Sequence, residues 1–110
     1  RFKFMLLKFK DVIETLPDIT NLEKIELYDL EDNFTDKIDN LPGTQGSLKV
    51  YFYLYKTFKV INFQAAQKGL ELFAEYTNDA KKSPGCHPNI DRLINIIKSK
   101  NSLKTKVIPR

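Results

Sequence analysis

The feature that most constrains the fold is the apolar run at residues 48–58, which follows a turn with two glycines at residues 42–47. Its apolar residues recur at helical spacing and also occupy the other sides of such a helix. Residues 50–55 would also suit a buried strand, because aromatic and β-branched residues favour strands. We favour a helix, because Ser47 is suited to cap it and the run is long for a strand. This helix requires burial nearly all round, or a partner subunit.

The chain before this run predicts one helix and one β-hairpin. Residues 5–16 have the apolar spacing of an amphipathic helix, which Pro17 ends. Residues 23–30 and 34–41 alternate between apolar and polar side chains and are separated by the turn at residues 31–33. Since a hairpin is marginally stable alone, it requires a third strand or a helix over its apolar face.

The chain after the run predicts two more helices and a closing strand. Asn62 is suited to cap a helix at residues 63–81, and Pro88 stands close to the first position of the next helix. Residues 102–108 alternate like a strand. We therefore predict an α+β fold, with a small three-stranded antiparallel sheet and about four helices packed on one face.

The length bounds the organisation of the chain. Its 110 residues suffice for one domain with one core, so we predict a single domain over residues 1–110. Residues 1–4 precede Met5 and are treated as sequence from upstream of the natural start or as a disordered end. No apolar run is long enough for a bilayer span or a signal segment, so we expect a cytoplasmic protein without membrane contact.

Charge is distributed unevenly along the chain. Residues 11–40 carry ten acidic and two basic side chains, whereas residues 81–110 carry eight basic side chains and one acidic one. A basic tail is typical of nucleic-acid or lipid binding, but it can also pair with the acidic segment. We favour pairing, because a closing strand against the hairpin would bring opposite charges onto one face. The side chains concerned are Lys104, Lys106, Glu26 and Asp39.

The turn at residues 43–47 is the first candidate site. Two glycines at a helix start let backbone N–H groups converge, and the helix dipole favours an anion there. The sequence lacks the glycine spacing and the lysine of a nucleotide-binding P-loop. A strand-to-helix turn that needs glycine backbone angles is therefore the alternative explanation.

The second candidate is the segment at residues 86–92, which holds the only histidine and the only cysteine of the chain. A lone histidine at a helix start more often caps the helix or faces solvent than acts as a base, and adjacent Cys and His rarely face each other. A single cysteine permits no internal disulfide, and we predict no metal and no cofactor. The ligand-binding candidates from both segments are Gly43, Gln45, Gly46, Ser47, His87, Asn89 and Arg92.

Both segments carry a family resemblance. Pro-Gly-Thr-Gln-Gly-Ser-Leu at residues 42–48 and His-Pro-Asn-Ile-Asp-Arg-Leu at residues 87–93 resemble the small bacterial proteins grouped as domain of unknown function 2322. The likeness extends over roughly residues 8–108, and it implies a bacterial, soluble, single-domain protein without an established activity. Members often have Lys at the position of Thr44 and another residue at the position of Cys86. These departures weaken an anion clamp and argue against thiol catalysis.

We predict a binding or interaction module without a catalytic residue. Its aromatic helix and short sheet edge are more apolar than a small monomer easily covers, which favours a homodimer or an unidentified protein partner. An alternative is a small enzyme that uses His87 as acid or base, assisted by Asp91 or Ser47. A second alternative is nucleic-acid binding through residues 98–110.

Overall fold

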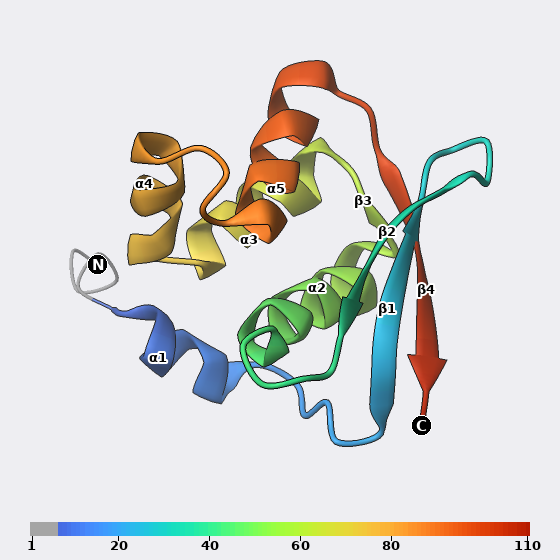
Figure 1. Cartoon of the computed structure of the whole chain (residues 1–110), viewed down its shortest axis with the longest axis horizontal. Coiled ribbons are helices and arrows are strands. Elements are labelled where there is room, and N and C mark those ends of the chain that lie inside the picture. Colours follow the sequence, from blue (N-terminus) through green and yellow to red (C-terminus); the bar gives the residue numbers. More distant parts are fainter. Residues whose placement is uncertain (1–6) are drawn as a thin grey trace.

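The computed structural model describes residues 7–110. Its helices lie on one face of an antiparallel sheet of four strands in the order β2-β1-β4-β3 (Figure 1). The α+β class and the hairpin are confirmed, but the prediction of three strands is wrong. The strands are β1 (Leu22–Tyr28), β2 (Phe34–Asp39), β3 (Val60–Ile61) and β4 (Leu103–Pro109). The added strand, β3, has only two residues, which is too short to show an alternating pattern.

Five α-helices and one 3₁₀ turn, rather than about four helices, make up the helical layer of the described residues. The predicted helix at residues 63–81 is broken at Ala74, whose φ of +54° cannot continue a helix. The predicted helix at residues 5–16 is only one short α-helix and the 3₁₀ turn, and its first two residues lie outside the described part. The helices are α1 (Phe9–Val12), the 3₁₀ turn η2 (Ile13–Thr15), α2 (Gln45–Phe58), α3 (Phe63–Leu72), α4 (Glu75–Lys82) and α5 (Pro88–Ser99).

Of three helix starts predicted from the sequence, two are confirmed and one is wrong. The Asn62 side chain accepts a hydrogen bond from the N–H of Ala65 at 2.8 Å, as expected of an N-cap, and Pro88 is the first residue of α5. The N-cap prediction for Ser47 is wrong, because α2 already begins at Gln45 and Thr44 holds the cap position. Ser47 therefore lies in the first turn of α2.

The core lies between the inner face of the sheet and α2. Ile25 and Leu27 of β1 and Ile38 of β2 point inward, and each is at most 2% exposed. Against them α2 buries Leu48, Val50, Tyr51 and Leu54. The chain thus covers most of its aromatic helix by itself, and this helix no longer requires a second subunit.

The basic tail pairs with the acidic hairpin, as predicted. Strand β4 lies antiparallel to β1, with Lys106 directly opposite Glu26. At the hairpin turn, Lys104 Nζ lies 2.8 Å from Asp32 Oδ1. Two of the tail lysines are therefore next to acids, which removes them from the free basic stripe that nucleic-acid binding would require. Within residues 7–110, none of the helices combines the length and apolar character needed to cross a membrane.

Candidate functional site

The turn before α2 is held by its own side chains. Gly43 has a φ of +96°, which explains a glycine at this position. Thr44 Oγ1 donates to the carbonyl of Asp39 at 2.6 Å, and Gln45 Nε2 donates to Asn40 Oδ1 at 2.9 Å. Gly43 and Gln45 thus connect β2 to α2, and the Gln45 amide is engaged within the protein.

Gly46 has a different role, because an aromatic ring lies directly on it. A Cβ atom at Gly46 would approach Phe9 Cε2 to 2.8 Å, so only glycine leaves room for this ring. Phe9 stacks on Phe73 with ring centres 5.4 Å apart and meets Tyr76 edge-on at 5.5 Å. The Tyr76 ring in turn lies 5.6 Å from the ring of His87. Phe9 and Tyr76 therefore connect the start of α2 with the start of α5.

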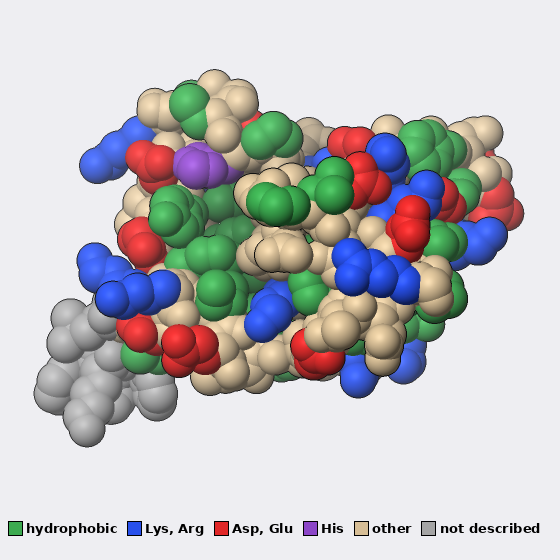
Figure 2. All heavy atoms as spheres, turned by 60° about the horizontal axis from the view of Figure 1, so that its bottom comes forward, with side chains coloured by type: hydrophobic (Ala, Val, Ile, Leu, Met, Phe, Trp, Pro, Cys, Tyr) green, Lys and Arg blue, Asp and Glu red, His purple; other side chains and the backbone are tan. Residues whose placement is uncertain are grey.

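His87 occupies the N-cap position of α5, but its side chain does not cap the helix. Its Nε2 lies 2.7 Å from Asp79 Oδ2 in α4. A carboxylate at this distance favours a proton on Nε2, which leaves Nδ1 as an acceptor when the ring is neutral. In Figure 2 the histidine borders a hollow in which apolar side chains gather, and Tyr76 beside it is 40% exposed.

Arg92 belongs to a network that joins three elements. Its Nη1 donates to Tyr51 Oη at 3.1 Å and to Asn89 Oδ1 at 2.9 Å, and its Nη2 donates to Asp36 Oδ2 at 2.6 Å. The Tyr51 hydroxyl donates to the carbonyl of Asn89 at 2.6 Å. Burial raises the pKa of Tyr51 to about 12, although the Arg92 guanidinium acts in the opposite direction. The network fixes the guanidinium on α5 against α2 and β2.

Ser47 lies one turn before Tyr51, and residues four apart share a face of a helix. Ser47 is half-buried and therefore lies on the same side of α2 as Tyr51. We define the helix-start surface as Ser47, Tyr76, His87, Asn89 and Arg92. Five of the seven predicted residues lie on or beside this surface, including Gly46 under Phe9. A ligand at this surface stays a prediction.

Sequence reasoning missed the partners that hold these residues. Asp79 lies eight residues before His87 and belongs to another helix, while Asp36 is fifty-six residues from Arg92. No spacing rule connects such pairs. Tyr51 is a fully buried core residue, and nothing in its spacing showed that its hydroxyl would contact α5.

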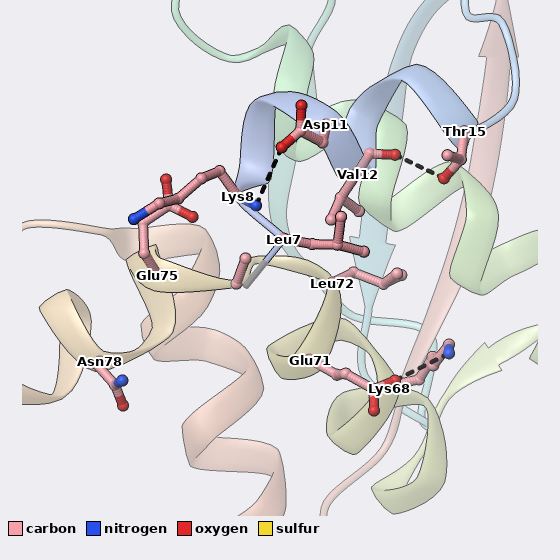
Figure 3. Close-up of a pocket in the computed structure, with 11 residues that line it drawn as sticks. Leu7, Lys8, Asp11, Val12, Thr15, Lys68, Glu71, Leu72, Glu75 and Asn78 are labelled. Carbon is pink, nitrogen blue, oxygen red and sulfur yellow. Dashed lines mark hydrogen bonds and ion pairs between the residues drawn. The ribbon is translucent and has the colours of Figure 1, made fainter. Parts of the chain in front are cut away.

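A separate groove of about 870 Å³ lies between α1 and the junction of α3 and α4 (Figure 3). Its apolar part includes Leu7, Val12 and Leu72, and charged side chains surround it. At its end, Glu75 Oε1 accepts a hydrogen bond from the N–H of Phe9 at 2.8 Å. The groove exists because the bend before α4 turns that helix away from α3, and this bend was not predicted. The remaining lining residues are Lys8, Asp11, Thr15, Lys68, Glu71, Ala74 and Asn78.

A second cavity of about 610 Å³ lies between the end of α4 and α5, and His87 lines neither of the two. Across the part of the chain that the structure describes, no three His, Cys, Asp or Glu side chains are grouped to hold a metal ion. Cys86 is exposed and its thiol is free.

Comparison with known proteins gives one match. The model of a family described as an uncharacterized protein conserved in bacteria, domain of unknown function 2322, matches residues 9–107. This is the family that the two sequence strings at the helix starts indicated. No curated protein and no solved structure gives a match.

Proposed function

We propose, from the premise that the chain belongs to domain of unknown function 2322, that it is a small binding module for an anionic ligand. The ligand would occupy the helix-start surface, with its oxyanion near His87 and Arg92 and its apolar part against Tyr76. The family description names no activity, so the proposal rests on the geometry of this surface.

The proposal is supported by two basic side chains near the start of one helix, one of which, His87, lies beside an exposed aromatic ring. His87 and Arg92 lie in the first turns of α5, where the helix dipole also favours negative charge. Each basic group already contacts one carboxylate, Asp79 and Asp36 respectively. The surface thus accommodates carboxylates next to both groups, and Tyr76 supplies apolar area.

A thermal-shift screen with inorganic phosphate, nucleotides and small carboxylates tests this proposal. A ligand at about a hundred times its Kd stabilises by roughly 2.7 kcal/mol, or on the order of ten degrees for a domain of this size. We expect the shift to vanish in His87→Ala and to persist in Lys98→Ala, which removes an exposed cation from the last turn of α5. Equal shifts in both variants, or none in the wild type, would contradict an anion site here.

The enzyme alternative is favoured by one specific contact. A general acid or base requires a pocket and a second polar group within hydrogen-bond reach; Asp79 lies 2.7 Å from His87, but His87 lines neither of the two cavities. The alternative predicts slow turnover of generic nitrophenyl esters or phosphates, which both His87→Ala and Asp79→Asn would abolish. Turnover that persists in both variants, or none in the wild type, would leave His87 as part of a binding surface.

We also propose a homodimer that uses the tip of the β1–β2 hairpin. Leu30 and Phe34 are 57% and 56% exposed, and both lie at this tip. Light scattering after size exclusion should give twice the mass of one chain, and Phe34→Ser should reduce it to a single chain. Leu7→Ser, at an exposed leucine beside α1, is the control that should leave the mass unchanged.

A further inference from the structure

The guanidinium of Arg92 is only partly occupied by protein acceptors. Its Nη1 has two acceptors within the protein, Tyr51 Oη and Asn89 Oδ1. Its Nη2 has one, Asp36 Oδ2, and its Nε donates to no protein acceptor among residues 7–110. The Tyr51 ring also lies 5.6 Å from the guanidinium carbon. Arg92 is therefore held in place even without Asp36.

Asp36 is the weakly held partner in this network. Its side chain is 54% exposed, whereas that of Arg92 is 14% exposed. Only one carboxylate oxygen reaches Arg92, because the other accepts the N–H of Lys37 at 2.8 Å. A free carboxylate or phosphate has no such second bond to keep. It can bind Nε and Nη2 together through two oxygens, which is the favoured geometry for arginine.

We propose that Asp36 is a built-in competitor for the anionic ligand. Its carboxylate occupies the part of Arg92 that the oxyanion of the ligand takes, so that binding exchanges one ion pair for another. This inference rests on the proposed function and adds a regulation of the same site. Ligand affinity is then set partly by how tightly β2 holds Asp36 against α5.

Two consequences distinguish this exchange from simple binding beside an intact ion pair. Removing the charge of Asp36 raises the affinity for the anion, because nothing has to be displaced. In addition, the Lys37 N–H loses its acceptor when Asp36 moves, so its amide signal reports the exchange in the wild type.

The test is a titration with inorganic phosphate, and separately with acetate, at constant ionic strength, followed by amide NMR. The proteins are the wild type, Asp36→Asn, Arg92→Gln and the matched control Asp32→Asn. The control removes a carboxylate of the same hairpin that is paired with Lys104 at 2.8 Å and is not in contact with Arg92. We expect Asp36→Asn to lower the Kd about fivefold, which corresponds to about 1 kcal/mol for an ion pair that is exposed on its Asp36 side. Asp32→Asn should bind like the wild type.

The outcomes separate this inference from the proposed function. Tighter binding by Asp36→Asn, lost in Arg92→Gln, supports the competition, whichever of the two anions shows it. Arg92-dependent binding that is equal in wild type and Asp36→Asn overturns the competition and leaves the binding site. If neither the wild type nor Asp36→Asn binds either anion, both the competition and the proposed binding site are overturned. If Asp36→Asn does not fold, the wild type decides, because a Lys37 amide that stays unchanged at saturation overturns the exchange.

Discussion

Replacing Tyr51 by phenylalanine removes one oxygen from the centre of the Arg92 network. The Tyr51 side chain is fully buried, and its hydroxyl makes two hydrogen bonds. One is a 2.6 Å bond to the carbonyl of Asn89, and the other is accepted from Arg92 at 3.1 Å. Phenylalanine fills the same space without strain, so the loss measures the two bonds and not a cavity.

The size of the loss follows from the partners left behind. The Asn89 carbonyl lies in the first turn of α5 and keeps its helical partner, so losing the Tyr51 bond to it costs about 0.5–1.5 kcal/mol. Arg92 keeps Asn89 and Asp36 as partners, so the loss of its bond to Tyr51 should cost near the lower end of the range for a hydrogen bond to a charged group, about 1.5–3 kcal/mol. We expect Tyr51→Phe to reduce the free energy of unfolding by about 2 kcal/mol, which corresponds to about 8 °C in Tm at this chain length.

Urea unfolding and calorimetry measure this loss, with Tyr55→Phe as the matched control. Tyr55 lies on the same helix and is half-buried, but its hydroxyl makes no hydrogen bond to any of the described residues. Its replacement should change stability by less than about 0.5 kcal/mol. Equal effects of the two substitutions would refute the claim that the Tyr51 hydroxyl holds α2 to α5.

Three further predictions concern the same core. Because the folded state raises the pKa of Tyr51 from 10.0 to about 12, its protonated form is favoured on folding. The contribution of this protonated hydroxyl to the free energy of unfolding is complete below pH 10.0 and is lost as the pH rises towards about 12, at about 1.4 kcal/mol per pH unit. Urea titrations should therefore show a smaller difference in stability between wild type and Tyr51→Phe as the pH rises over that range. Gly69→Ala would place a methyl group 2.6 Å from Leu93 Cδ1, so overpacking should outweigh the gain in helix propensity. Urea unfolding should show a loss of about 1 kcal/mol in the free energy of unfolding. A higher free energy of unfolding would contradict the close contact between α3 and α5. Ala74→Gly should stabilise by about 1 kcal/mol by relieving a φ of +54°, whereas Ala80→Gly within α4 should destabilise by at least about 1 kcal/mol, and calorimetry would detect either sign.

The sequence predicted those elements in which the pattern of apolar and polar side chains repeats over many residues. The hairpin, the closing strand and α2 each have six or more residues, and their alternation or helical spacing determined the correct type. The pairing of the tail with the hairpin followed from charge. In contrast, the break at Ala74 was invisible, because the apolar spacing of residues 63–81 continues through it and neither Gly nor Pro marks the position.

The cap of α2 shows how a local rule fails when several residues satisfy it. Both Thr44 and Ser47 carry hydroxyls suited to an N-cap, and the pattern favoured the one next to the apolar run. In the structure Thr44 holds the position, but its hydroxyl bonds back to the carbonyls of Asp39 and Leu41. The turn that enters the helix therefore determines where it begins, and this turn depends on the end of β2.

The candidate site was predictable only as two separate segments. Their glycines, histidine and arginine were visible, and a helix start at each gave a reason to group them. The groups that orient them were not visible, because Phe9, Tyr76 and Asp36 come from other elements and meet the site only in three dimensions.

Edge strand β2 also constrains how two copies of the chain would associate. Asn40 N–H donates to the carbonyl of Glu23 at 2.9 Å, so the backbone of residue 40 points towards β1. Antiparallel strands alternate in this respect, and the backbone groups of Asp39 and Lys37 therefore point away from the sheet. These groups form the free edge to which a second sheet could pair.

That edge is already partly closed by the chain itself. The N–H of Lys37 donates to Asp36, and the carbonyl of Asp39 accepts from the hydroxyl of Thr44. A second copy that added a strand to β2 would have to break both bonds before forming its own. A homodimer at the hairpin tip therefore has to form through side chains, and Phe34, the first residue of β2, supplies an exposed aromatic ring there that already packs edge-on against Tyr28.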